Sequence, residues 1–300
     1  MFKGINAIEF NKHFQSNDDC FEYLVKLKWP EGFTCSRCGC KDCIKGRTWH
    51  HRRCKACRYD ENVLANTVFH GTKMPLIKAF HMVFRLTAKK KGMSTTELGH
   101  EVGVEQKTAW LFKRKVQQMM KAGKEDDIGG NATADEFLLG GYQAKQPGRS
   151  LETKQAVLIV SEQLEDGRTG KIRLTHIENF EADTLKYAIK DVIEKDTSIT
   201  TDAYSSYKSL KEDMKLTLVK SEKGSALEEL HIQIMQFKNW LRGIHHKCSK
   251  EHLHAYLNEY VFRFNRRNKR KYLFDEIISK MMKDIPHPYN YLLTKCGCYT

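Results

Sequence analysis

The pattern of apolar and polar positions changes near residue 130. Before it, apolar side chains recur at helical spacing, and a broken apolar stripe predicts a helix over residues 7–29. Trp29-Pro30 ends this helix, because proline disfavours helical backbone in the residue before it. A second helical stretch is expected from Thr72 to about Leu86.

Two further helices are predicted next. Ser94-Thr-Thr-Glu97 has the pattern of a capping box, in which a hydroxyl and a carboxylate satisfy free N–H groups at a helix start. This helix would run to about Val102, Gly103 would make the turn, and a longer helix would cover residues 105–121. Two helices joined by a tight turn containing glycine resemble a helix-turn-helix.

After residues 122–130, which look like a linker, the pattern favours strands. We expect strands at 133–139, 156–161 and 171–177, a helix over 181–194, strands at 198–202 and 216–219, and helices over about 226–242 and 250–267. Three strands followed by alternating helices and strands is the element order of an RNase H-like core. The fold class expected is therefore α/β, with this core preceded by smaller regions.

Length and composition limit the class of protein. Three hundred residues suggest two or three domains of roughly 100–200 residues each. The chain has no apolar run close to the roughly 20 residues of a membrane span, and its start lacks the pattern of a signal peptide. We therefore expect a cytoplasmic protein whose ten cysteines are metal ligands or thiols rather than disulfides.

The charge balance indicates the kind of partner. The formal net charge is +14, from 51 basic and 37 acidic side chains. Cationic surface binds polyanions because counterions are released from the phosphate backbone. Double-stranded DNA, and hence a place in the nucleoid, is the expectation. The alternative is a basic protein whose charge serves only solubility.

Two cysteine pairs near the N-terminus predict a zinc ribbon. Cys35 and Cys38 form one Cys-x-x-Cys turn, and Cys54 and Cys57 form another after an interval of fifteen residues. Each turn supplies two thiolates, and tetrahedral Zn²⁺ needs four ligands. The alternative is two unrelated turns of reduced cysteines. Cys40 and Cys43 lie close by, and we interpret them as bystanders.

Basic residues surround these cysteines. Arg52 and Arg53 are among them, and Trp49 is an aromatic neighbour that could stack on a base. This mixture is typical of a ribbon that contacts DNA. The alternative is a solvated knuckle that only holds a fold.

The second helix of the expected helix-turn-helix carries candidate DNA contacts. In such motifs the N-terminal residues of this helix enter the major groove, and here they include Gln106 and Lys107. Glutamine pairs with adenine and lysine with guanine edges. Lys113 and Arg114 follow as candidate phosphate contacts. An ordinary helical hairpin between two domains is the alternative interpretation.

Two acids occur where strands are expected. Asp135 lies within an otherwise apolar strand, and a buried acid there is costly unless it is paired or metal-bound. Asp202 ends another strand, where ligands gather in α/β sheets. Glu136 alternates to the opposite face, so it cannot share a site with Asp202. Two such carboxylates predict a site for divalent metal, which a two-metal phosphoryl-transfer mechanism uses.

The helix expected from about residue 226 offers further groups. His231 can complete a metal shell through a neutral imidazole nitrogen, and Lys238, two turns later, can bind a phosphate. Separately, each is more typical of a solvated helix face. The last expected helix ends in a cationic cluster that includes Arg263, Arg266 and Arg267, which we interpret as a grip on the DNA backbone.

Several motifs resemble a known family. They include Tyr23–Cys38, Gly71-Thr-Lys-Met-Pro-Leu76, Ala134-Asp-Glu-Phe-Leu-Leu-Gly-Gly141, Thr201-Asp-Ala-Tyr204, Leu241-Arg-Gly-Ile-His-His246 and His252–Arg267. On these the chain resembles the bacterial insertion-sequence transposases of the DDE class, in the zinc-ribbon family called ISXO-type. The resemblance runs nearly from end to end.

The resemblance implies roles for individual residues. Asp135 and Asp202 would be the first two catalytic acids, and the third position, usually glutamate, falls on His231 with Lys238 seven residues later. Glu228 is the rival third ligand. A nitrogen ligand is softer than a carboxylate, so the site would use Mg²⁺ or Mn²⁺ and tolerate Mn²⁺ well.

The implied protein binds terminal inverted repeats, cleaves DNA and joins the freed end to target DNA, as a homo-oligomer assembled on DNA. The regions expected are an N-terminal helix and zinc ribbon at 1–70, a helical DNA-binding region at 71–121, the linker, a catalytic domain at 131–270 and a tail at 271–300. Two alternatives are a nuclease or resolvase that cleaves without joining, and a DNA-binding regulator derived from a transposase.

Overall fold

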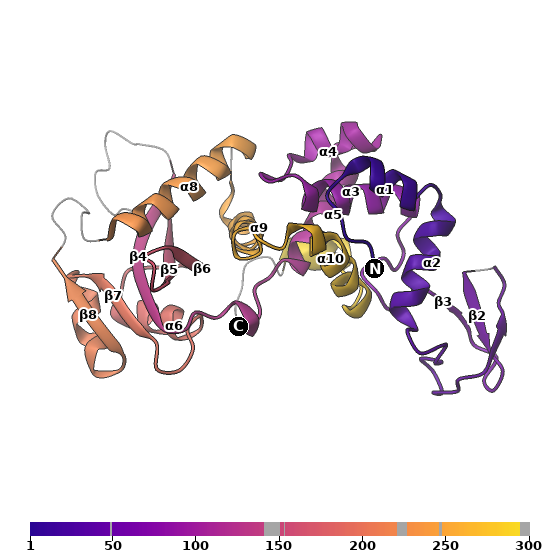
Figure 1. The fold of residues 1–300 in the computed structure, drawn as a ribbon, viewed down its shortest axis with the longest axis horizontal. Coiled ribbons are helices and arrows are strands. Elements are labelled where there is room, and N and C mark those ends of the chain that lie inside the picture. The colour runs from indigo at the N-terminus through magenta and orange to yellow at the C-terminus, as the bar shows by residue number, and fades with distance from the viewer. Residues whose placement is uncertain (49, 141–150, 153, 221–226, 246–247, 295–300) are drawn as a thin grey trace. The chain divides into compact units, whose positions relative to one another are not determined.

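The computed structural model describes residues 1–48, 50–140, 151–152, 154–220, 227–245 and 248–294. Trp49, Gly141 and His246, which belong to the sequence motifs, lie outside these residues. The chain divides into two compact units, one of Met1–Met119 with Asn268–Lys295 and one of Met120–Arg267 with Cys296–Thr300. Figure 1 labels their elements.

Helices make up most of the first unit. They are α1 (Ala7–His13), α2 (Asn17–Lys28), α3 (Leu76–Ala88), α4 (Thr95–Val102), α5 (Gln106–Met119), α10 (Leu273–Lys283) and α11 (Tyr289–Thr294). The single helix expected over 7–29 was wrong, since α1 and α2 are separate. Ser16 starts α2 through a capping box, in which its hydroxyl accepts the N–H of Asp19 and the Asp19 carboxylate accepts the N–H of Ser16.

Aromatic side chains fill the core of this unit. The rings of Phe10 and Phe84 stack with centroids 4.2 Å apart, and Phe274 of α10 lies edge-on to Phe10 at 5.4 Å. The region expected to be a tail, 271–300, therefore contains a core helix. Its apolar stripe of Leu273, Phe274, Ile277, Ile278 and Met281 is almost fully buried, which fixes α10 in the unit.

The two helices and the glycine turn expected at 94–121 are present. The hydroxyl of Ser94 accepts the N–H of Glu97 at the start of α4. Gly103 ends α4 with φ at 66°, a left-handed conformation that glycine adopts without steric cost. Helix α5 then begins at Gln106.

The cysteine-rich segment forms a three-stranded antiparallel sheet of β1 (Cys43–Lys45), β2 (His51–Cys54) and β3 (Asp60–Asn62). A buried ion pair ties this sheet to α2. Glu61 of β3, only 1% exposed, accepts the ammonium of Lys28 at 3.2 Å and the N–H of Ser36 at 3.0 Å. This pair fixes the ribbon on the helix that precedes it.

The second unit contains a five-stranded mixed sheet in the order β6-β5-β4-β7-β8. Its strands are β4 (Asn131–Leu139), β5 (Gln155–Gln163), β6 (Thr169–Ile177), β7 (Ser198–Asp202) and β8 (Lys215–Val219). The first three pair antiparallel, whereas β7 pairs parallel with both β4 and β8. Its longer helices are α6 (Ala182–Lys190), α8 (Glu228–Ile244) and α9 (Leu253–Asn265). This is the RNase H-like core that the element order predicted.

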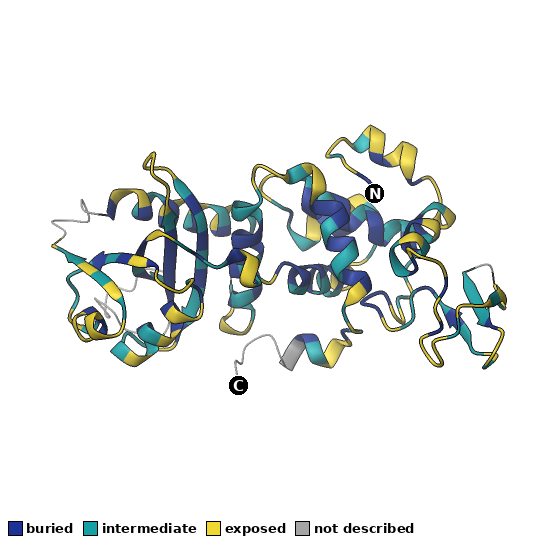
Figure 2. Cartoon of the chain, turned by 60° about the horizontal axis from the view of Figure 1, so that its bottom comes forward, coloured by how far each residue is buried: buried dark blue, intermediate teal, exposed yellow. Residues whose placement is uncertain are grey.

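Alternating residues of the strands build two cores, one on each face of the sheet. Phe137 and Ile159 pack with Phe237 of α8 and Tyr260 of α9. Residues of the opposite parity pack with α6 and with Tyr207 in the short helix α7 (Ser205–Lys208). In Figure 2 the inner strands of this sheet are largely dark blue, because most residues of β4 and β5 are buried, whereas β8 has no buried residue. The sheet is thus covered on both faces, and its strand ends are the places left for chemistry.

The segment expected to be a linker, 122–130, belongs to the second unit. Ile128 is fully buried, and its N–H and C=O bond to the backbone of Val192 and Glu194. Asp126 is 3% exposed and accepts the side chains of Asn265 and Arg266. The linker interpretation was wrong because Asp126 and Ile128 are buried and bond to residues far along the chain.

None of the described helices combines the length and the apolar character that crossing a lipid bilayer requires.

Candidate functional site: an acidic centre and a cysteine cluster

Strand pairing brings Asp135 and Asp202 side by side. Ala134 of β4 lies opposite Thr201 of β7 in the parallel ladder, and each aspartate is the next residue of its strand. The Asp135 side chain is 15% exposed. Burial and then the nearby charge of Asp202 raise the pKa of Asp135, against hydrogen bonds from His231 and Glu136 that lower it. A cation between the two acids would remove this cost.

His231 of α8 reaches the same carboxylate. Its Nε2 lies 3.0 Å from Oδ2 of Asp135, while Oδ1 accepts the backbone N–H of Glu136 at 2.8 Å. Asp202 accepts the N–H of Tyr204 at 3.2 Å through Oδ1. Glu228, the rival ligand, is exposed at the first residue of α8. The structure therefore brings His231, rather than Glu228, against the first acid.

These groups suit a divalent metal ion in kind, although they do not form a closed cage. Two carboxylates and one imidazole are ligands for Mg²⁺ or Mn²⁺. Their ligand atoms do not all lie within 4.8 Å of one another, whereas among the described residues the four cysteines do. Metal binding through Nε2 of His231 would replace its contact with Asp135, because both would use the same nitrogen atom.

The acid on the other face has a structural partner. Tyr207 donates its hydroxyl to Oε2 of Glu136 at 2.6 Å, and both side chains are buried. Burial, followed by the charge of Glu136, raises the pKa of Tyr207 well above its ordinary value. The alternation of β4 predicted that Glu136 points away from Asp202, but nothing in the sequence pointed to Tyr207. This bond ties β4 to the helix that follows Asp202, so it holds the two aspartates in place.

Lys238 lies two helical turns after His231. Its Nζ is 5.1 Å from the ring centroid of Phe137, which shares a face of β4 with Asp135. Burial and then the charge of Arg242 lower the pKa of Lys238, whereas Asp135 raises it. The ammonium is therefore held in the electric field of the first acid.

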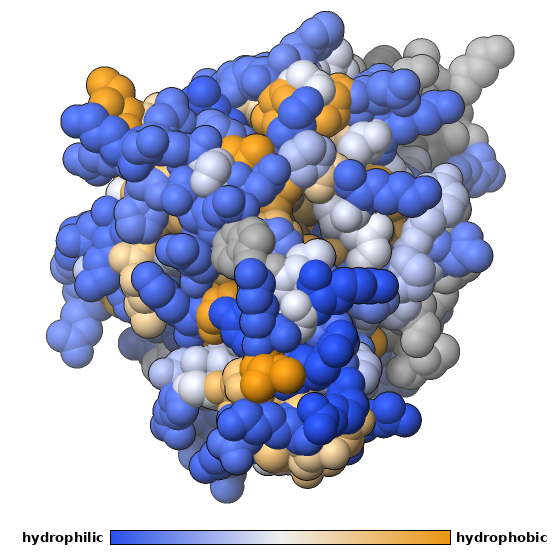
Figure 3. All heavy atoms as spheres, turned by 90° about the vertical axis from the view of Figure 1, so that its right-hand side faces the viewer, coloured by the Kyte–Doolittle hydropathy of each residue, from blue (hydrophilic) through white to orange (hydrophobic). Residues whose placement is uncertain are grey.

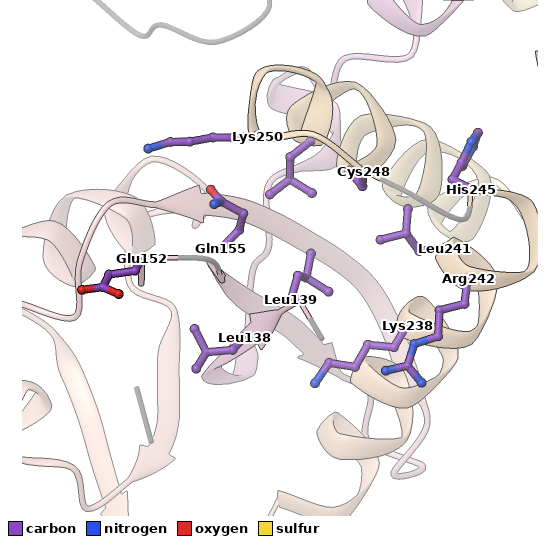
Figure 4. Close-up of a pocket in the computed structure, with 12 residues that line it drawn as sticks. Leu138, Leu139, Glu152, Gln155, Lys238, Leu241, Arg242, His245, Cys248 and Lys250 are labelled. Atoms are coloured by element: carbon purple, nitrogen blue, oxygen red, sulfur yellow. The ribbon is translucent and has the colours of Figure 1, made fainter. Parts of the chain in front are cut away.

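A cavity of about 580 Å³ opens beside Lys238 (Figure 4). Its lining comes from the end of β4, the start of β5, α8 and the segment before α9. The residues are Leu138, Leu139, Gly140, Glu152, Gln155, Lys238, Leu241, Arg242, His245, Cys248, Lys250 and Leu253. Among these residues only Lys238 has a chemical role that the sequence predicted.

The four predicted cysteines converge in the ribbon. Sγ of Cys35 lies 3.6 Å from Sγ of Cys57, and Sγ of Cys38 lies 3.5 Å from that of Cys54. Zinc–sulfur bonds of about 2.3 Å in a tetrahedron place sulfurs about 3.8 Å apart, so the cluster has the size that Zn²⁺ requires. Backbone N–H groups, that of Cys57 foremost, lower the pKa of Cys54 to about 6. The cluster is a structural zinc site.

Cys40 and Cys43 do not belong to this group of four. Arg52 and Arg53 lie on β2 beside it; Arg53 pairs with Asp60 at 3.1 Å and keeps 43% of its side chain exposed. Figure 3 views the molecule from the ribbon's side, and hydrophilic side chains dominate that face. The expected cationic rim is thus accessible on β2.

Two of the residues expected on the recognition helix are buried. The ammonium of Lys113 donates to the carbonyl of Met93 at 2.8 Å, and Arg114 bonds Gln117 and lies over the ring of Trp110. Each has 2% of its surface exposed, so neither is placed to contact a phosphate. They serve the fold of this unit, because their charged ends have partners within it. Gln106 and Lys107 remain exposed at the start of α5.

The cationic side chains near the end of α9 also bond to groups within the protein. Arg263 pairs with Glu259 at 2.7 Å, and Arg266 pairs with Asp126 at 3.0 Å. Arg267 donates to the carbonyls of Thr169 and Gly170. Arg263 and Arg266 are therefore largely buried and paired within the protein, whereas Arg267 remains exposed.

Replacing Arg266 by alanine should destabilise the second unit by about 3 kcal/mol, because the buried Asp126 loses its charged partner. Chemical denaturation measures this change. Arg168→Ala, which removes an exposed ion pair with Asp166, should leave the free energy of unfolding nearly unchanged. A tenfold or greater loss of DNA affinity in the folded Arg266→Ala protein would instead restore the grip interpretation.

Known families match both the segment that forms the acidic centre and the segment that holds the cysteine cluster. Residues 127–265 match the ISXO2-like transposase domain, and residues 15–60 match the transposase zinc-ribbon domain. A solved structure described as a pre-cleavage Mos1 transpososome is similar over 74% of this chain and 79% of that chain, with 9% identity and a TM-score of 0.29. No curated protein matches the chain. By its two domains, the chain belongs to the ISXO2-like family of DDE-class transposases with an N-terminal zinc ribbon.

Proposed function

We propose that this transposase binds the terminal inverted repeats of its insertion sequence, cleaves the DNA at their ends and joins the freed ends to target DNA. The observation that carries the proposal is the meeting of three groups. Asp135 and Asp202 are neighbours on parallel strands, and His231 contacts the first of them from α8. Lys238 lies on the same helix beside them.

Asp135, Asp202 and His231 would hold Mg²⁺ or Mn²⁺. The chemistry that such an ion supplies, when bound, is activation of the attacking oxygen and stabilisation of the leaving one. The protein's own contribution is position. The Tyr207–Glu136 bond and the N–H groups of Glu136 and Tyr204 orient the two carboxylates before substrate arrives.

The reaction would proceed in two displacements. Water attacks the phosphorus at the end of the element, the bond from phosphorus to the 3′ oxygen breaks, and that oxygen takes up a proton. The resulting 3′-hydroxyl then attacks a target phosphodiester in line and expels its 3′ oxygen. Lys238 would hold the phosphate through charge in both steps, because its ammonium lies near Asp135 in a partly buried position.

The first unit would bind the DNA. Arg52 and Arg53 offer cations on an accessible strand of the zinc ribbon, and Gln106 and Lys107 offer base-reading groups at an exposed helix start. Lys113, Arg114, Arg263 and Arg266 are left out, since they are largely buried and bond within the protein. A homo-oligomer on DNA is proposed because two ends must be brought together, and the nucleoid is where this substrate is found.

Changing His231 tests the metal site. His231→Ala should reduce the cleavage rate by about 100-fold or more in Mg²⁺, because one ligand is lost. His231→Glu should retain cleavage and lower the ratio of the rate in Mn²⁺ to the rate in Mg²⁺, since an oxygen replaces the softer nitrogen. Single-turnover cleavage of a labelled inverted-repeat duplex in each metal gives both quantities.

Glu228→Gln is the matched control, one helical turn earlier on α8 and exposed. It should cleave at a rate within about twofold of the unmodified protein, as most surface substitutions have small effects. A large loss in Glu228→Gln, together with an active His231→Ala protein, would transfer the third ligand to Glu228.

A further inference from the structure

We infer that the cavity beside Lys238 receives one unpaired nucleotide of the DNA strand next to the cleaved bond. The inference rests on the proposed function, and it adds a ligand for this cavity, namely a single unpaired nucleotide. Its support comes from three features of the lining, which are its apolar walls, the placement of its cations and its hydrogen-bonding groups.

Leucines form the walls. Leu138 and Leu139 end β4, while Leu241 comes from α8 and Leu253 from the start of α9. At about 580 Å³ the cavity lies within the range of about 300–1,000 Å³ that is usual for sites of small organic ligands. A surface that only follows the DNA backbone has no use for such walls, because phosphates lose hydration against them. A nucleobase, in contrast, gains by burying its faces.

Cationic side chains lie on two sides of the cavity. In Figure 4, Lys238 and Arg242 project from α8 at one side, and Lys250 lies at the other with Glu152. A nucleotide within a strand carries a phosphate on each side of its sugar, so cations on two sides of the cavity suit both phosphates. Three cations against one carboxylate leave the lining positive, which is the condition for phosphate binding.

The remaining polar groups suit the edge of a base. Oε1 of Gln155 lies 3.1 Å from Nε2 of His176, so the amide nitrogen is the group that Gln155 can offer to a ligand. Bases of intact duplex are stacked and hide their faces, so entry requires one base to leave the helix, and burial of its faces together with charge contacts would offset the loss of stacking and pairing.

The experiment uses full-length protein and an inverted-repeat duplex in which 2-aminopurine replaces, one at a time, each base within three positions of the cleaved bond. Stacking quenches this base, so fluorescence should rise about threefold or more at one position and stay near its initial value at the others. A mismatch opposite that position should also tighten binding by about tenfold, because the cost of unpairing is already removed.

Two cavity variants locate the site. Lys250→Gln and Leu139→Gln should each lose most of the fluorescence rise and of the gain from the mismatch. Lys195→Gln, which removes an exposed cation just before β7, is the matched control and should keep both. Melting temperature and zinc content establish that each variant is folded.

The possible failures are distinguishable. If the unmodified protein cleaves and joins DNA but no position brightens, or if the rise survives in both cavity variants, the inference is wrong and the proposed function stands. If the unmodified protein neither cleaves nor joins, the proposed function is wrong, and this inference falls with it.

Discussion

Asp202→Asn should reduce both DNA cleavage and strand transfer by about 10³-fold or more, with DNA affinity within about twofold of the unmodified protein. The amide has the shape of the carboxylate, so it can still accept the N–H of Tyr204 and keep the end of β7 intact. It lacks the negative charge that would hold a divalent ion beside Asp135. Single-turnover assays of each step, with a binding titration, measure the effect.

Asp196→Asn is a suitable control for this variant. Asp196 precedes β7 in a left-handed conformation with φ at 69°, which asparagine also adopts readily, and its ion pair with Lys215 is exposed. Activity should be nearly unchanged. Retained strand transfer in Asp202→Asn would refute the assignment of the second acid.

Cys54→Ser should abolish zinc binding and lower the affinity for inverted-repeat DNA by about 100-fold. The ribbon has three short strands and few buried apolar side chains, so the metal supplies most of its folding energy, about 10–16 kcal/mol in zinc-finger peptides. The second unit has its own cores and should still unfold cooperatively. Zinc content by mass spectrometry and a calorimetric scan check both statements.

Cys40→Ser serves as the comparison, since Cys40 lies near the cluster without belonging to it. This variant should keep one zinc ion per chain. Loss of zinc from Cys40→Ser, or its retention in Cys54→Ser, would mean that the ligands are misassigned.

The sequence was informative wherever a local pattern decides structure. Alternating apolar positions located β4 and β7, and the direction of alternation separated Asp135 from Glu136. The two Cys-x-x-Cys turns predicted a cluster that the ribbon indeed forms. In each case the signal extends over a few neighbouring residues, so it does not depend on distant partners.

The sequence was misleading where a distant partner decides. In the sequence Lys113 and Arg266 look like solvated cations. In the structure Lys113 bonds to the carbonyl of Met93, and Arg266 pairs with the carboxylate of Asp126. The sequence pattern did not indicate the helix α10, because its apolar stripe directly follows a run of basic residues. Residues of the cavity come from four segments, and no spacing along the chain connects them.

Strand transfer by the purified protein tests the central claim most directly. Labelled duplexes carrying the inverted repeats would be incubated with target DNA in Mg²⁺ and in Mn²⁺, with Asp202→Asn in parallel. We expect joined products in both metals and none with the variant. Binding without cleavage would contradict the account in favour of a DNA-binding regulator, and cleavage without joining would contradict it in favour of a nuclease or resolvase.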